Sequence, residues 1–154
     1  MSSSRFKRCR ALIIAQLVLL SVQGWSGDFV NVFVTTTPRH GVISLVGVLG
    51  LIESGGGFLV WHGVEGVVIV VLGATILTLS FKHHRGVVVS ALLALLSVVS
   101  AGIGGVMFVA SGFSAGGASM QMGGSFIAAY ALYFIALYKL SKTSPLLGAG
   151  ILKV

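Results

Sequence analysis

The chain has 154 residues, of which 56% are hydrophobic and only 8% are charged. Soluble domains average about 25% charged and roughly 45–50% apolar residues. The composition therefore excludes an ordinary water-soluble globule, a disordered tail and a collagen-like fibre, and it is typical of an integral membrane protein. The single cysteine, Cys9, excludes an intrachain disulfide and a multi-cysteine metal site. The formal net charge is +7. The positions of the basic residues along the chain determine whether this charge indicates nucleic-acid binding or the topology of a membrane protein.

The first apolar stretch covers residues 11–34 and follows the basic segment MSSSRFKRCR. A basic segment before a short apolar one also resembles a secretory signal. The apolar character continues past Gly24, however, and no A-x-A cleavage site is present. These features favour an uncleaved transmembrane helix, which needs about 20 apolar residues to cross a hydrocarbon core. Cys9, just before this helix, is interpreted either as an inert thiol or as a lipidation site.

Residues 41–52 (GVISLVGVLGLI) form a shorter apolar segment between Pro38 and the sequence ESGGG. A helix of this length reaches only about 18 Å, which is too short to cross a membrane. We therefore expect a short outer helix that is interfacial or re-entrant. The alternative is a fifth transmembrane helix, which would place Lys82 and Arg85 on the side opposite the N-terminal basic cluster.

Three further apolar stretches are long enough to span a membrane: residues 58–81, 87–110 and 118–138. The basic sequence KHHR separates the first of these from the second, because charged side chains are costly in hydrocarbon. The small-residue sequence SGFSAGG, at residues 111–117, predicts a turn between the last two. The predicted fold is an all-α, four-transmembrane-helix bundle, with residues 1–154 forming one membrane domain.

The basic residues lie almost entirely on one side of this predicted bundle. Nine of the ten Lys and Arg residues fall in the N-terminal tail, the loop after the second span or the C-terminal tail, and only Arg39 falls on the other side. By the positive-inside rule, this distribution predicts a multi-pass protein of the cell membrane with both termini cytoplasmic. The lipid bilayer is the expected environment. Nucleic acid is not an expected partner, because the basic residues flank the spans and lack interleaved aromatic residues.

The first and third spans share a short sequence, LVLLSV at residues 17–22 and LALLSV at residues 93–98. One interpretation is a duplicated helical hairpin, and the other is chance recurrence of common membrane residues. Glycines within the spans would allow helix backbones to approach closely, which is the main packing device in lipid. We expect a homo-oligomer or other membrane subunits as partners.

Polar side chains in the spans gather toward the outer side. Glu65 lies about two turns into the second span, and His62 lies three residues earlier on the same helical face. Side chains from the first and fourth spans are predicted to join them at similar depth. The predicted polar cluster comprises Asp28, Asn31, His62, Glu65 and Gln121. Intramembrane ionisable residues are candidates for function, although a hydrogen-bonded network that pins the helices together is an equally good interpretation.

His62 is also a candidate heme ligand. A neutral imidazole on a bundle helix can occupy an axial position, and a thioether is a recognised partner for it. If the hairpin is duplicated, Met120 is equivalent to His62, so Met120 and the nearby Met122 are the candidate second ligands. Glu65 is the candidate catalytic or proton-carrying group. No other metal site is predicted.

Two helical hairpins, an outer ionisable site and a histidine near the start of the second span resemble the half-length, four-span form of heme A synthase. The resemblance covers the hydropathy plan of most of the chain. It implies heme binding through His62 and a role for Glu65 in oxidising a heme methyl group. In that family the glutamate lies three residues before the histidine and a second histidine lies on the fourth span. Here His62 precedes Glu65, and the fourth span carries the sequence MQM at residues 120–122.

The sequence contains no G-x-x-x-x-G-K-[ST], H-E-x-x-H or C-x-x-C motif. The leading hypothesis is a small non-catalytic membrane protein, either a subunit or a small-molecule-binding component of a larger complex such as a respiratory one. The first alternative is a heme-binding redox enzyme. The second is a small oligomeric transporter.

Overall fold

The computed structural model describes residues 3–35 and 45–142, and these residues form five α-helices and no strand. The helices are α1 (Ser3–Phe33), α2 (Leu45–Ser54), α3 (Gly56–Ser80), α4 (Arg85–Ala110) and α5 (Gly116–Lys142). All except α2 are long and apolar enough to cross a membrane. The chain is therefore all-helical with four membrane-length helices, as its composition predicts. Of the predicted short helix, residues 41–44 lie outside the described part.

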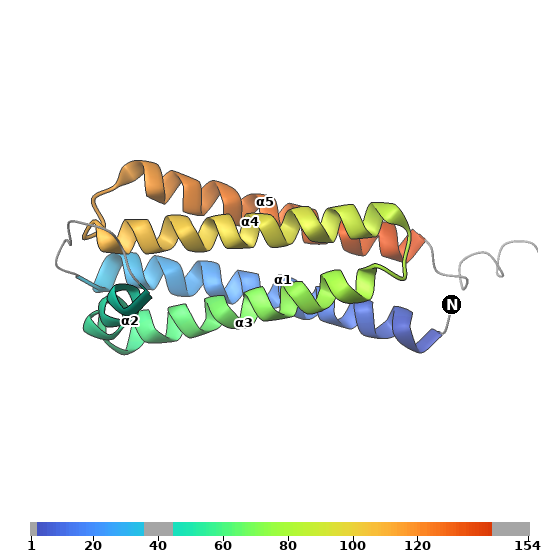
Figure 1. Ribbon diagram of the computed structural model, residues 1–154, viewed down its shortest axis with the longest axis horizontal. Coiled ribbons are helices and arrows are strands. Elements are labelled where there is room, and N and C mark those ends of the chain that lie inside the picture. Colours follow the sequence, from blue (N-terminus) through green and yellow to red (C-terminus); the bar gives the residue numbers. More distant parts are fainter. Residues whose placement is uncertain (1–2, 36–44, 143–154) are drawn as a thin grey trace, which may run out of the picture.

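The four long helices form a bundle in which successive helices run in opposite directions (Figure 1). Helix α1 packs against α3 and α5, and α4 packs against the same two helices. Within the described residues, α1 and α4 therefore lie on one diagonal, and α3 and α5 on the other. Helix α2 packs against α3 and α4 at the end where α3 begins. Helix α1 begins at the opposite end, where α5 also ends.

Both turns between the last three long helices lie where the sequence predicts them. Between α3 and α4, the Nδ1 atom of His84 accepts a hydrogen bond of 3.1 Å from the backbone N–H of Gly86. Between α4 and α5, the hydroxyl oxygen of Ser111 accepts bonds from the backbone N–H groups of Ser114 (3.1 Å) and Ala115 (2.9 Å). Gly112 there has a φ of 65°, which glycine adopts without the steric cost of a side chain.

Helix α1 begins earlier than predicted, at Ser3 instead of residue 11. Phe6 and Cys9 are buried and continue the inward-facing stripe of Ile13 and Leu20, so packing extends the helix through the basic tail. A helix of 31 residues is about 46 Å long, which exceeds a hydrocarbon core of roughly 30 Å. The basic first turns can therefore project beyond the hydrocarbon.

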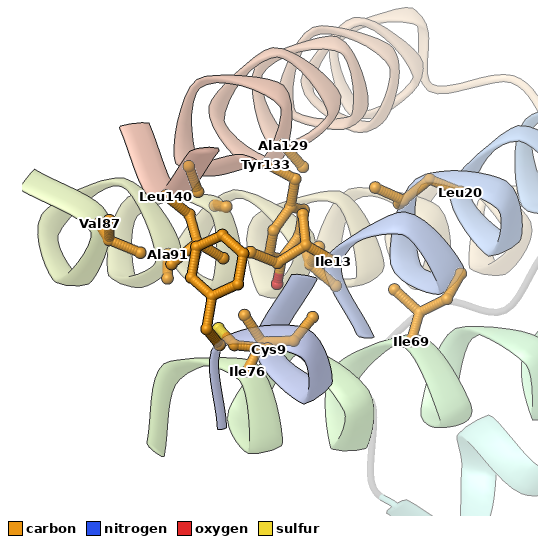
Figure 2. Close-up of a cluster of buried hydrophobic side chains, with 14 residues drawn as sticks. Cys9, Ile13, Leu20, Ile69, Ile76, Val87, Ala91, Ala129, Tyr133 and Leu140 are labelled. Atoms are coloured by element: carbon orange, nitrogen blue, oxygen red, sulfur yellow. The ribbon is translucent and has the colours of Figure 1, made fainter. Parts of the chain in front are cut away.

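The hydrophobic core fills the half of the bundle that contains the start of α1 and the end of α5. Figure 2 shows large side chains meeting there, among them Ile13 of α1, Ile76 of α3 and Tyr133 of α5. Helices α4 and α5 approach each other closely because small residues line their contact. A Cβ atom on Gly104 would lie 2.8 Å from the backbone nitrogen of Met122. The predicted close-packing role of glycine is thus observed at Gly104.

Candidate functional site: the α1–α3 polar cluster

Four polar side chains meet between α1 and α3 inside the otherwise apolar bundle. Gln23 and Ser26 lie one turn apart on α1, and His62 and Glu65 lie one turn apart on α3, so each pair shares a helical face. Ser26 is 8% exposed and Glu65 is 6% exposed. We call Gln23, Ser26, His62 and Glu65 the α1–α3 polar cluster.

The hydroxyl of Ser26 lies at the centre of this cluster. Its oxygen is 2.8 Å from Nδ1 of His62 and 2.9 Å from Oε2 of Glu65. An ionised carboxylate only accepts hydrogen bonds, and a hydroxyl has a single hydrogen to donate. The Ser26 oxygen also lies 3.1 Å from the backbone carbonyl oxygen of Gln23, which competes for the same hydrogen. A bond to an ionised carboxylate is the shorter and stronger of the two, so with Glu65 ionised Ser26 donates to Glu65 and accepts a bond from the Nδ1–H group of His62. This order of donors assigns the hydrogen of a neutral His62 ring to Nδ1.

The amide of Gln23 packs against the ring of His62. Its nitrogen is 3.0 Å from Nε2 and 3.2 Å from Nδ1 of that ring. The amide nitrogen carries two N–H donors. It donates one bond of 3.2 Å to the backbone carbonyl oxygen of His62, and Nε2, which the Nδ1–H form of the ring leaves as an acceptor, is within reach of the other. The amide oxygen of Gln23 is buried and has no hydrogen-bond partner among the residues that the structure describes.

Two glycines make room for these side chains. A Cβ atom on Gly27 of α1 would lie 3.1 Å from Cε1 of His62, and one on Gly66 of α3 would lie 3.7 Å from the amide nitrogen of Gln23. The His62 ring therefore packs directly on the backbone of α1. A side chain at residue 27 would require the ring to move.

The structure brings together only two of the five residues of the predicted cluster, His62 and Glu65. Asp28 and Asn31 are exposed on α1, and no hydrogen bond among the described residues joins them to the cluster. Gln121 is exposed on α5, and its amide nitrogen lies 3.4 Å from both the carbonyl and the hydroxyl oxygen of Ser100 on α4. The reason is that α5 lies diagonally across the bundle from α3, so that within the described residues the backbones of these two helices do not pack side by side.

The structure places Gln23 and Ser26 in the cluster instead of these three residues. For Gln23, the sequence contains a pattern that indicates an inward-facing position. Cys9, Gln16 and Gln23 follow one another at intervals of seven residues, which keeps them on one face of a helix. Cys9 and Gln16 are fully buried in the structure, so this face of α1 is the inward one.

The residues proposed to bind heme do not fit a heme held inside the bundle. Met120 is 80% exposed on α5, which lies diagonally across the bundle from the helix that carries His62. The sulfur of Met122 lies against α4, 3.4 Å from the position of a Cβ atom on Gly105. The His62 ring is engaged by Ser26 and packed on Gly27. Among the described residues, no group of three or more His, Cys, Asp or Glu side chains could hold a metal ion.

Comparison of the chain with protein-family models, with curated proteins and with solved structures found no match. The fold itself defines a class, which is an all-helical protein with four apolar helices long enough to cross a membrane. The features that bear on a more specific function are the α1–α3 polar cluster and the surface of the bundle.

Proposed function

We propose that this chain is a non-catalytic subunit of a larger complex in the cell membrane. Both termini and the α3–α4 turn would lie on the cytoplasmic side, and α2 would lie on the outer side. The excess of basic residues at one end of the bundle supports this orientation. The polar cluster would then hold α1 against α3 near the outer side, where it stabilises the pairing of these helices.

The observation that supports a non-catalytic role is that Ser26 engages both ionisable side chains of the cluster inside the bundle. Ser26 joins His62 to Glu65 through hydrogen bonds of 2.8 and 2.9 Å. Its hydroxyl therefore serves both neighbours, and at 8% exposure it lies inside the bundle. Moving a charged side chain to the centre of a bilayer costs about 2.5–3.5 kcal/mol or more, so a carboxylate that is buried and hydrogen-bonded in this way is consistent with a structural tie.

A groove between α4 and α5 supports the role as a subunit. The groove has a volume of about 400 Å³ and is lined by Leu93, Leu96, Ser97, Ser100, Gly124, Ser125, Ala128 and Leu132. Most of these residues are small or carry a hydroxyl, and Leu93 and Leu96 are exposed beside them. Helix interfaces in lipid are enriched in small and hydroxyl side chains, because these let backbones approach closely. A transmembrane helix of another subunit is the occupant that this groove fits.

Gly124→Leu tests the proposal without disturbing the subunit itself. A Cβ atom on Gly124 meets nothing within 4 Å, so leucine fills the groove and does not clash inside the bundle. Gly123→Leu is the matched control, because a Cβ atom there also meets nothing within 4 Å and the residue does not line the groove. Both substitutions give the same gain in helix propensity.

The measurement is the size of the complex in mildly solubilised native membranes, obtained by native gel electrophoresis. We expect the wild type and Gly123→Leu to migrate well above the 15.9 kDa chain and Gly124→Leu to migrate as the free subunit. If the complex contains only copies of this chain, the occupant of the groove is a second copy of the chain and not a different subunit. A wild-type protein that migrates alone, or a Gly124→Leu variant that stays in the complex, would contradict the proposal.

A further inference from the structure

A second polar group lies deeper in the bundle, at the level where all four long helices meet. Gln16 of α1 and Tyr133 of α5 are both 0% exposed. Figure 2 shows Tyr133 reaching from α5 into the middle of the hydrophobic core. Unlike the α1–α3 polar cluster, this group contains no ionisable carboxylate or histidine. We call Gln16, Gly73, Leu95 and Tyr133 the central junction.

The glycine of α3 shows how close the two polar side chains are. A Cβ atom on Gly73 would lie 2.6 Å from the phenol oxygen of Tyr133 and 3.7 Å from the amide nitrogen of Gln16. The phenol and the amide therefore reach the same point on the backbone of α3. Leu95 of α4 closes this point on another side, with its Cδ1 atom 3.1 Å from the same Cβ position.

Both side chains retain hydrogen-bonding groups without a partner. The amide nitrogen of Gln16 donates a bond of 3.1 Å to the backbone carbonyl oxygen of Ile69. Within the described part of the chain, however, the amide oxygen of Gln16 has no partner, and the hydroxyl of Tyr133 lies near the Gln16 amide without making a hydrogen bond of good geometry. Buried polar groups are nearly always paired with protein or with ordered water, because leaving them unpaired in an apolar interior is unfavourable.

We propose that the central junction binds a water molecule that bridges Gln16 and Tyr133. The two unpaired groups are complementary to water, which can accept from the phenol O–H and donate to the amide oxygen. Buried waters typically make two to four such bonds to groups that the protein leaves unsatisfied.

This water would connect three helices at the middle of the bundle. It joins α1 to α5 through Gln16 and Tyr133, and the bond from Gln16 to the carbonyl oxygen of Ile69 extends the connection to α3. The glycine at residue 73 is part of the same arrangement, because any side chain there would occupy the position of the phenol oxygen.

An experimental structure that resolves ordered water tests the proposal, with two variants and one control. We expect a water peak within about 3.2 Å of both the Gln16 amide oxygen and the Tyr133 phenol oxygen. Tyr133→Phe preserves the ring and should lose the peak. Gln16→Met keeps the side-chain length, removes the amide oxygen and should lose it as well. Tyr130→Phe changes a partly exposed tyrosine on the same helix and should retain the peak.

Two results would overturn the proposal. One is a wild-type structure in which Tyr133 donates directly to Gln16 with no water between them. The other is a peak that persists in Tyr133→Phe, which would show that the phenol does not hold it.

Discussion

Ser26 and Glu65 are 39 positions apart in the chain, and a hydrogen bond of 2.9 Å joins them across the contact between α1 and α3. Because the same hydroxyl also lies 2.8 Å from His62, this one small side chain links both ionisable groups of the cluster. Removing it leaves a buried carboxylate without its donor, so the stability of the bundle should depend on it.

Ser26→Ala should therefore lower the free energy of unfolding by about 1–3 kcal/mol, the usual cost of leaving a buried polar group unpaired. Ser21→Ala is the control, because Ser21 is exposed and its hydroxyl donates to the backbone carbonyl oxygen of Leu17 in its own helix. Reversible unfolding in mixed micelles measures the free energy of unfolding of both variants. In a Glu65→Leu background Ser26→Ala should cost less, and equal costs in the two backgrounds would show that Ser26 and Glu65 are not coupled.

Two glycines on α4 should respond in opposite ways to alanine. A Cβ atom on Gly104 would lie 2.8 Å from a backbone atom of α5, whereas one on Gly102 meets nothing within 4 Å. Gly104→Ala forces the two backbones apart, and we expect a loss of about 1–3 kcal/mol, as for overpacked cores. Gly102→Ala should instead stabilise the helix by up to about 1 kcal/mol. Thermal unfolding of the two variants in the same detergent compares them, and a similar effect at both positions would contradict the close contact of α4 and α5.

The turn between α3 and α4 should make stability depend on pH. Burial of its ring lowers the pKa of His83 from the ordinary value of 6.5, and both ring nitrogens are buried with no partner in residues 3–35 and 45–142. The unfolded chain then binds a proton at a higher pH than the folded chain, so stability falls as the pH decreases from about 6.5 through the lower folded pKa. Unfolding of the wild type and His83→Phe between pH 7.5 and about 5 measures the difference. A loss of stability on acidification that is identical in both proteins would exclude His83 as its source.

The sequence predicts the four long helices well because a span requires about 20 apolar residues and this requirement can be read without tertiary information. It also predicts the α4–α5 turn at Ser111, where small residues interrupt an uncharged run. The sequence does not predict which residues form the polar cluster, because that depends on how each helix is rotated about its own axis in the packed bundle. Asp28 lies close to Ser26 in sequence but faces outward. Gln121 faces α4 because α5 is diagonal to α3, and helix adjacency is a property of the packed bundle.

Cysteine labelling tests the proposed orientation. A cysteine introduced at Ser114, in the exposed α4–α5 turn, should react with an impermeant thiol reagent applied to intact cells. A cysteine at His83 should react only after the membrane is opened. The native thiol of Cys9 is fully buried and should not contribute. Labelling of the His83 variant from outside would reverse the proposed topology.

The His62 ring is occupied by its hydrogen bond with Ser26 and by its packing on Gly27, and heme titration tests this arrangement most directly. Purified protein is titrated with hemin and followed by its visible absorption spectrum, alongside His62→Ala. We predict that the protein as isolated shows no Soret band and that the wild type and His62→Ala give indistinguishable, unsaturable spectra. A saturable Soret band in the wild type that His62→Ala abolishes would contradict the account and would favour the heme-binding alternative.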